Sequence, residues 1–161
     1  MAAISTIAVL GLGKIGVLAA RLLADAGFNV TGYDQNALSD KNFKTQILDV
    51  TDADALKSVL TQADAVLSCL PYNFNKDVAT AAVLANTHYF DLTEDVDTTN
   101  HIRRLAQNAD CVFAPQCGLA PGFIGIVGAH LAQRFGTLRS IKLRVGALPQ
   151  NPTGMMGYNF N

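Results

Sequence analysis

Apolar, β-branched runs alternate with segments of helical periodicity along most of this 161-residue chain. Each run is short and almost entirely apolar, which is typical of a parallel strand covered by helices on both faces. We expect strands at residues 4–10, 28–33, 43–48, 65–70, 88–92 and 111–114, and a helix at 123–135. The alternation predicts an α/β protein with a doubly wound parallel sheet, a Rossmann fold, in the strand order 3-2-1-4-5-6.

Helical periodicity also predicts which side chains face the sheet and which cap the helices. In the first helix the expected inward stripe comprises Ile15, Leu18, Ala19, Leu22, Leu23 and Ala26. Thr51 and Asp54 have the spacing of a capping box, so a helix is expected to follow them. Asn73 or Asn75 is expected to cap the next helix.

The glycine pattern GLGKIG at residues 11–16 lies between the first expected strand and the first expected helix. In a dinucleotide-binding unit Gly11 would permit the tight turn, and Gly13 would let a diphosphate approach the backbone. Gly16 would let the helix pack closely on the strand. The amides at the helix start, including those of Lys14 and Ile15, would then face the phosphates. The position of the pattern therefore predicts a dinucleotide site.

Asp34 ends the second expected strand, 18 residues after Gly16. A carboxylate there accepts hydrogen bonds from the hydroxyls of the adenosine ribose and repels a 2′-phosphate. The next residues, Gln35 and Asn36, carry no positive charge that would bind that phosphate. We therefore expect NAD as the cofactor in preference to NADP.

Other strand ends are expected along the same edge of the sheet, because ligands of open parallel sheets bind beyond the carboxyl ends of the strands. Asp49 and Val50 would flank the adenine, and Leu70 and Pro71 would approach the central ribose. For Asp49 the alternative is a purely local role at the entrance of the following helix.

Three further segments carry a family resemblance: CGLAPG at 117–122, DLTED at 91–95 and VGALPQNP at 145–152. Together with GLGKIG they make the chain resemble the saccharopine dehydrogenase family, with its branch of lysine 6-dehydrogenases as the nearest likeness. The resemblance implies an NAD(P)-dependent oxidoreductase of lysine metabolism that acts at a carbon–nitrogen bond of an amino acid or imine. It also implies that Gly118 and Pro121 lie near the nicotinamide.

The resemblance further implies two domains. Residues 1–137 would form the dinucleotide-binding Rossmann domain, and residues 138–161 would begin an α+β domain for substrate binding and dimerisation. Alternating apolar and basic residues at 141–145 predict a strand with one wet face. Because family members continue into an antiparallel sheet, we expect this chain to be a truncated form that is inactive alone. The expected partners are a dinucleotide and a small amino-acid-like substrate, with a homodimer of the full-length form left open.

The sequence offers two candidates for a catalytic residue. Asp91 and Cys117 are candidates because both lie near the expected nicotinamide end of the site. The alternatives are that Asp91 binds loop amides or caps a helix, and that Cys117 is a small buried residue. Glu94 reads as a solvated residue of a helix's first turn. No histidine, cysteine or acidic residues have the spacing of a metal site.

The composition excludes several other classes. The formal net charge is −1 and the basic residues are scattered, so neither nucleic acid nor an anionic membrane is an expected partner. No segment has the length of a membrane span. Three cysteines without a paired spacing favour a reducing cytoplasm. The alternatives left open are a nucleotide-sensing regulatory domain without catalysis, and an interaction domain pairing near Met155 and Met156.

Overall fold

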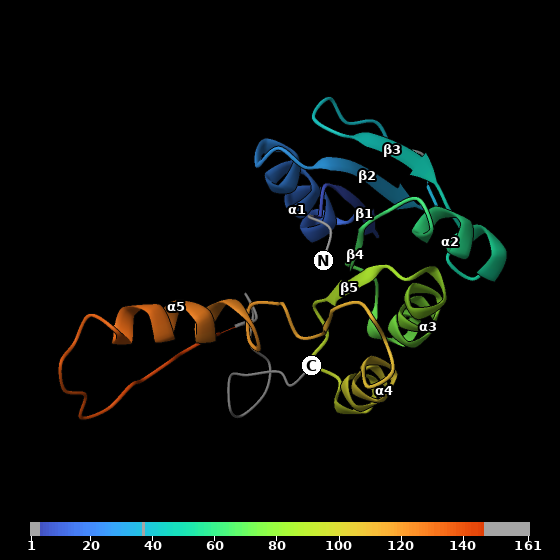
Figure 1. The fold of residues 1–161 in the computed structure, drawn as a ribbon. Coiled ribbons are helices and arrows are strands. Elements are labelled where there is room, and N and C mark those ends of the chain that lie inside the picture. The colour runs from blue at the N-terminus through green and yellow to red at the C-terminus, as the bar shows by residue number, and fades with distance from the viewer. Residues whose placement is uncertain (1–3, 37, 147–161) are drawn as a thin grey trace, which may run out of the picture.

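A computed structural model describes residues 4–36 and 38–146 and shows one sheet of parallel strands in the order β3-β2-β1-β4-β5-β6. This confirms the predicted fold and strand order (Figure 1). The strands are β1 (Thr6–Leu10), β2 (Asn29–Asp34), β3 (Lys44–Ile47), β4 (Ala65–Ser68), β5 (His88–Asp91) and β6 (Phe113–Ala114). The helices are α1 (Lys14–Asp25), α2 (Ala53–Leu60), η1 (Tyr72–Phe74), α3 (Asn75–Ala85), α4 (Val96–Ala106) and α5 (Phe123–Ala132).

Helices cover the two faces of the sheet unequally. One face packs against α2, α3 and α4, which lie side by side in Figure 1, and the other face packs against α1. In β1 the side chains of Ala8 and Leu10 join the first cluster, whereas Ile7 and Val9 join the second. Alternation along a strand explains the division, and burial on both faces explains why β1 is apolar from Ile7 to Leu10.

The inward face of α1 differs from the predicted stripe. Ile15, Leu18 and Leu22 are 59%, 55% and 59% exposed, whereas Gly16 and Ala20 are buried. The prediction was wrong for these three residues and for Ala26, which is also exposed, whereas the predicted Leu23 packs against the core. Gly16 faces inward because a side chain there would collide with the carbonyl oxygen of Gly11.

Two predicted helix caps are also corrected. Asp52, and not Thr51, caps α2, and its side chain accepts hydrogen bonds from the amides of Asp54 and Ala55. Asn75 is the first residue of α3 and caps nothing, because its side chain is buried and accepts a hydrogen bond from Ser68 Oγ at 2.7 Å. The short helix η1, which had no sequence signal, precedes it.

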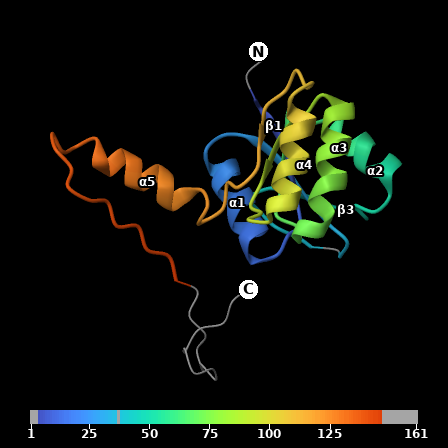
Figure 2. The ribbon, with the colours of Figure 1, turned by 90° about the horizontal axis from the view of Figure 1, so that it is seen from below.

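Helix α5 projects away from the sheet, as Figure 2 shows from a second direction. None of its residues is buried. Residues 141–145 are irregular and exposed, so the strand predicted there is wrong within the described residues. The described residues end at 146. Most of the segment VGALPQNP at 145–152 therefore lies outside them, as do Met155 and Met156. None of the helices in 4–36 and 38–146 is long and apolar enough to cross a membrane.

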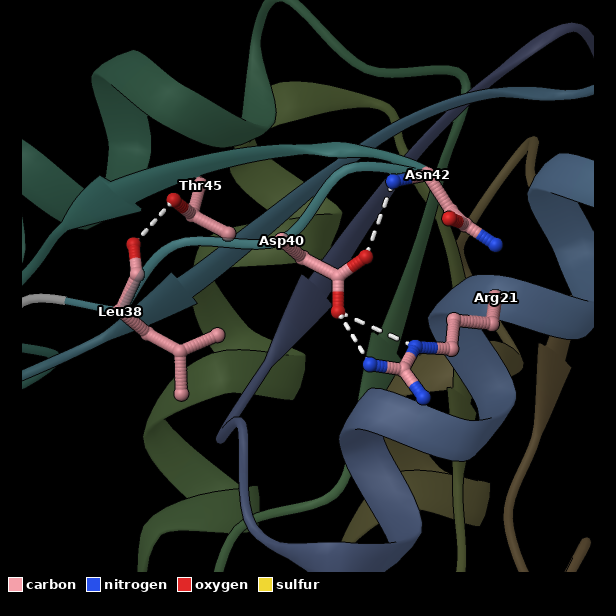
Figure 3. Close-up of polar contacts among 5 residues, drawn as sticks. All are labelled: Arg21, Leu38, Asp40, Asn42 and Thr45. Carbon is pink, nitrogen blue, oxygen red and sulfur yellow. Dashed lines mark hydrogen bonds and ion pairs between the residues drawn. The ribbon is translucent and has the colours of Figure 1, made fainter.

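An ion pair joins α1 to the loop between β2 and β3 (Figure 3). The guanidinium of Arg21 donates two hydrogen bonds to Asp40 Oδ2, at 3.0 Å from Nε and 2.7 Å from Nη2. Asp40 Oδ1 accepts a third from the amide of Asn42. The Arg21 hydrogen bonds, followed by that of Asn42, hold the pKa of the Asp40 carboxyl below its usual value.

We expect Asp40→Asn to have a lower free energy of unfolding than the wild type at pH 7. In acid, this difference between variant and wild type should disappear. The pKa of Asp40 is lower in the folded state, so its stabilising effect is complete above the unfolded value of about 4. It disappears as the pH falls through the folded pKa. Urea unfolding at pH 7 and at pH 3 measures the difference between variant and wild type. Asp25→Asn, at the exposed end of α1, is the control, and an equal loss at both pH values would contradict the assignment.

Candidate dinucleotide site

The turn after β1 requires glycine at two positions for reasons internal to the chain. Gly11 has a φ of +86°, and a Cβ there would lie 3.0 Å from the carbonyl oxygen of Cys69. A Cβ on Gly16 would lie 1.8 Å from the carbonyl oxygen of Gly11. The first turn of α1 therefore rests directly on the backbone of the preceding turn.

Gly13 has no such internal reason. Its φ is −69°, which any residue adopts, and an added Cβ would meet no atom of the described residues within 4 Å. Gly13 is also the N-cap of α1, where no side chain accepts a hydrogen bond and the first turn contains no acidic residue. Helix geometry leaves the amides of Lys14, Ile15 and Gly16 without intrahelical acceptors. The space beside Gly13 thus borders amides that suit an anion.

Asp34 connects the end of β2 to this turn. Its Oδ2 accepts a hydrogen bond from the amide of Leu12 at 2.8 Å, and its Oδ1 accepts one from the amide of Asn36 at 3.0 Å. The Asn36 hydrogen bond is the largest cause of a lowered pKa at Asp34; partial burial opposes it and the Leu12 hydrogen bond adds to it. Asp34 is therefore an ionised, partly exposed carboxylate beside the glycine turn.

A pocket of about 260 Å³ opens next to Asp34. It brings together five of the residues predicted to bind the cofactor: Asp34, Asp49, Val50, Leu70 and Pro71. Its other lining residues, which the sequence analysis missed, are Tyr33, Gln35, Leu48, Thr51 and Phe74. Four of these adjoin a predicted residue in the chain, so their position at strand ends was the available signal. Phe74 comes from η1, for which no pattern existed.

Asp49 has the local role considered for it and also lies beside the pocket. It lines the pocket, and its Oδ1 also accepts hydrogen bonds from the amide and the hydroxyl of Thr51, at 2.9 and 2.7 Å. The hydroxyl bond and then the amide bond lower the pKa of Asp49. The pocket therefore contains two carboxylates, and no lysine or arginine lines it.

Gly118 and Pro121 lie elsewhere, in the tight turn that leads from β6 to α5. A Cβ on Gly118 would lie 3.1 Å from the carbonyl oxygen of Leu92, so this turn packs against the end of β5. The turn closes through a hydrogen bond of 2.8 Å from the amide of Phe123 to the carbonyl oxygen of Gly118. These two residues do not line the pocket beside Asp34.

The two catalytic candidates have different environments. Asp91 is 0% exposed and binds loop amides, which is one of the alternatives considered for it. Cys117 is exposed, and its thiol donates to the carbonyl oxygen of Ala114 at 3.3 Å. Burial of its thiol, and then the negative charge of Asp91, raise the pKa of Cys117, so the thiol stays protonated at neutral pH. Glu94 precedes α4 as an exposed loop residue, and Asp95 caps that helix.

No group of three or more histidine, cysteine or acidic side chains in the described part of the chain could hold a metal ion.

Residues 7–112 match the family model described as the saccharopine dehydrogenase NADP binding domain. The chain belongs to the saccharopine dehydrogenase family. It therefore carries an NAD(P)-binding domain, as the resemblance implied. The match includes the glycine turn and every residue that lines the pocket beside Asp34, and it ends before Gly118 and Pro121.

Solved structures share the fold of this family member. Saccharopine dehydrogenase (L-Glu forming) from Saccharomyces cerevisiae has a TM-score of 0.63 and 24% identity, over 81% of this chain and 30% of its own. The enzyme WbmH of Bordetella bronchiseptica, in complex with NAD⁺, has a TM-score of 0.53 and 15% identity, over 70% of this chain and 55% of its own. The chain thus spans less than a third of the saccharopine dehydrogenase that it matches.

We expect alanine to be tolerated at Gly13 and not at Gly16. Gly16→Ala drives a methyl group into the Gly11 carbonyl and should cost about 1–3 kcal/mol of stability or more. Gly13→Ala places its methyl in open space and should change stability by less than about 1 kcal/mol. Urea unfolding of both variants measures the difference, and equal free energies of unfolding would show that α1 does not rest on the turn.

Proposed function

We propose that this chain binds NAD across the carboxyl edge of its sheet, and that proteins carrying it are oxidoreductases acting at a carbon–nitrogen bond. The open space at Gly13 carries this proposal. The fold itself accounts for Gly11 and Gly16, whereas a glycine at position 13 is explained by the approach of a ligand. The uncapped amides beside it suit a diphosphate.

The adenosine half of the cofactor would occupy the pocket beside Asp34. In a doubly wound sheet each half binds one mononucleotide, and this pocket is lined by residues that follow β2, β3 and β4. Asp34 would accept hydrogen bonds from the ribose, and Val50, Leu70 and Pro71 would pack on apolar parts of the nucleoside. The first-turn amides of Lys14 and Ile15 would contact the diphosphate, and Gly118 and Pro121 would border the nicotinamide.

The charge of the pocket favours NAD over NADP. Asp34 and Asp49 are both ionised at neutral pH because hydrogen bonds lower their pKa values. A 2′-phosphate on the adenosine ribose would approach these carboxylates without a cationic side chain in the lining to bind it. The family name mentions NADP, so the choice of cofactor is a property that this chain's own residues would set.

The proposed reaction converts an amino acid to an imine, with loss of a hydride from carbon and release of a proton from nitrogen to solvent, or reverses that step. When bound, the nicotinamide would accept or supply the hydride. The chain's residues would fix the position of the ring by binding the adenosine and diphosphate at a distance from it. The substrate class, an amino acid or imine of lysine metabolism, rests on the family.

We also propose that residues 1–137 are the dinucleotide-binding domain and that 138–161 begin a substrate and dimerisation domain of a longer homodimer. In support, every described residue from 133 to 146 is exposed, although Ile141, Leu143 and Val145 are apolar. The three free cysteines support a cytoplasmic protein. Membership of a dehydrogenase family supports an enzyme over a nucleotide-sensing regulatory domain.

Asp34→Ala should weaken NAD binding by roughly ten- to a hundredfold, because charge-assisted hydrogen bonds contribute about 1.5–3 kcal/mol. It should weaken NADP binding less, since it also removes a repulsion. Isothermal calorimetry with both cofactors measures the ratio of the two affinities.

Two further variants complete this experiment. Gly13→Ala should weaken NAD and NADP equally, because both have the same diphosphate. Asp110→Asn, an exposed carboxylate that precedes β6, should change neither affinity. An Asp34→Ala protein with the wild-type affinity for NAD would remove Asp34 from the site.

This chain should bind NAD and produce no NADH with lysine or saccharopine. The reason is that the described residues supply a cofactor pocket, whereas the proposed substrate domain only begins after residue 137. Absorbance at 340 nm measures NADH. Turnover at an ordinary enzymatic rate of roughly 1 s⁻¹ or more would contradict the proposed division into domains.

A further inference from the structure

A buried carboxylate lies between the strands of the second half of the sheet and the turn that leads to α5. Asp91, the last residue of β5, is 0% exposed. Its neighbours in the described structure are hydrogen-bond donors and carry no positive charge. A buried charge is costly unless several donors satisfy it, so the donors show what Asp91 holds in place.

Asp91 binds three separate parts of the chain. Its Oδ2 accepts a hydrogen bond from the hydroxyl of Tyr89 at 2.8 Å. Its Oδ1 accepts two more, from the amides of Thr93 and Gln116, each at 3.0 Å. Its backbone carbonyl oxygen accepts a fourth from the amide of Cys117 at 2.7 Å. Side chain and backbone of one residue therefore hold residues 116 and 117 against the end of β5.

The backbone at Gln116 needs such support. Its φ is +67°, a left-handed backbone conformation that residues other than glycine rarely adopt. A conformation of this kind persists where surrounding contacts enforce it, and its amide hydrogen bond to Asp91 Oδ1 is one such contact. The bend at Gln116 directs the chain into the turn that contains Gly118 and Pro121.

We infer that Asp91 is a positioning residue that holds the 116–122 turn at the nicotinamide half of the dinucleotide site. This inference rests on the proposed function. The adenosine pocket lies at the ends of β2, β3 and β4, so the other mononucleotide would extend toward the ends of β5 and β6. The turn held by Asp91 lies at those ends.

The geometry separates this role from that of a general base. A base must reach a proton of the substrate, whereas Asp91 has no exposed surface and already accepts hydrogen bonds at both oxygens. Asparagine can keep this pattern, because its amide oxygen can accept the two backbone hydrogen bonds while its nitrogen faces Tyr89. A positioning role at residue 91 therefore requires only a hydrogen-bond acceptor, which asparagine supplies. A general base at the same position would require an ionisable carboxylate, which asparagine lacks.

The test compares NAD with ADP-ribose, which lacks the nicotinamide, in calorimetric binding to the wild-type chain and to variants. Asp91→Ala should lower the affinity for NAD roughly tenfold and that for ADP-ribose by less than about twofold. Asp91→Asn should restore the NAD affinity to within about threefold of wild type. Tyr89→Phe is the matched control, since it removes the donor at Oδ2 and leaves both loop hydrogen bonds at Oδ1.

Each outcome decides a specific point. Equal weakening of both ligands by Asp91→Ala would show a general structural role and overturn the inference. An Asp91→Asn variant as weak as Asp91→Ala would show that the charge matters, which also overturns it. A wild-type chain that binds neither ligand would refute the proposed function itself. A wild-type chain that binds ADP-ribose, with unchanged NAD affinity in Asp91→Ala, would refute only the inference.

A second measurement applies if Asp91→Ala does not fold. In the wild-type chain, the amide of Gln116 should exchange its hydrogen as slowly as the amides of β5, although it lies outside any strand. Asp91→Asn should preserve this protection. Exchange at Gln116 as fast as at exposed loop residues would show that Asp91 does not hold the turn.

Discussion

The contact of Gly16 with the carbonyl of Gly11 is the constraint on which the site depends. Because no Cβ fits there, α1 begins directly above the turn that ends β1, and its first amides face the carboxyl edge of the sheet. The hydrogen bond from Leu12 to Asp34 then ties this turn to β2. The helix start proposed to bind the diphosphate and the carboxylate proposed to bind the ribose are thus connected through one turn.

The aspartates at the ends of three strands all accept hydrogen bonds from the loop that follows, but they differ in how much of the carboxylate is exposed to a ligand. Asp34, Asp49 and Asp91 each accept hydrogen bonds from amides of the loop that follows. Asp34 and Asp49 retain exposed surface in the pocket, so they can also meet a ligand. Asp91 is fully enclosed, and its remaining acceptor capacity holds a second loop. The depth of burial, which the sequence does not show, therefore separates the carboxylates that a ligand could reach from the one that contacts only the chain itself.

The sequence predicted the strand order and five of the residues that line the pocket beside Asp34, because both follow from the alternation of elements. Parallel strands bring their carboxyl ends to one edge, so Asp34, Asp49 and Leu70 had to lie near one another. It predicted the inward position of Leu23 but not those of Gly16 and Ala20, because hydrophobic periodicity favours the larger Leu18 and Leu22, which are exposed. The alternation of apolar and basic residues at 141–145 was likewise not enough to predict a strand, since no neighbouring strand pairs with this segment among the described residues.

The family match covers residues 7–112, so structural features within this range are shared with the family and those after it are not part of the match. Residues 7–112 contain the glycine turn and every residue that lines the pocket beside Asp34, so both lie within the domain that the family shares. The turn at 116–122 lies after the match, yet it is tied to Asp91 within it. A carboxylate within the matched residues is therefore hydrogen-bonded to a turn that lies beyond them.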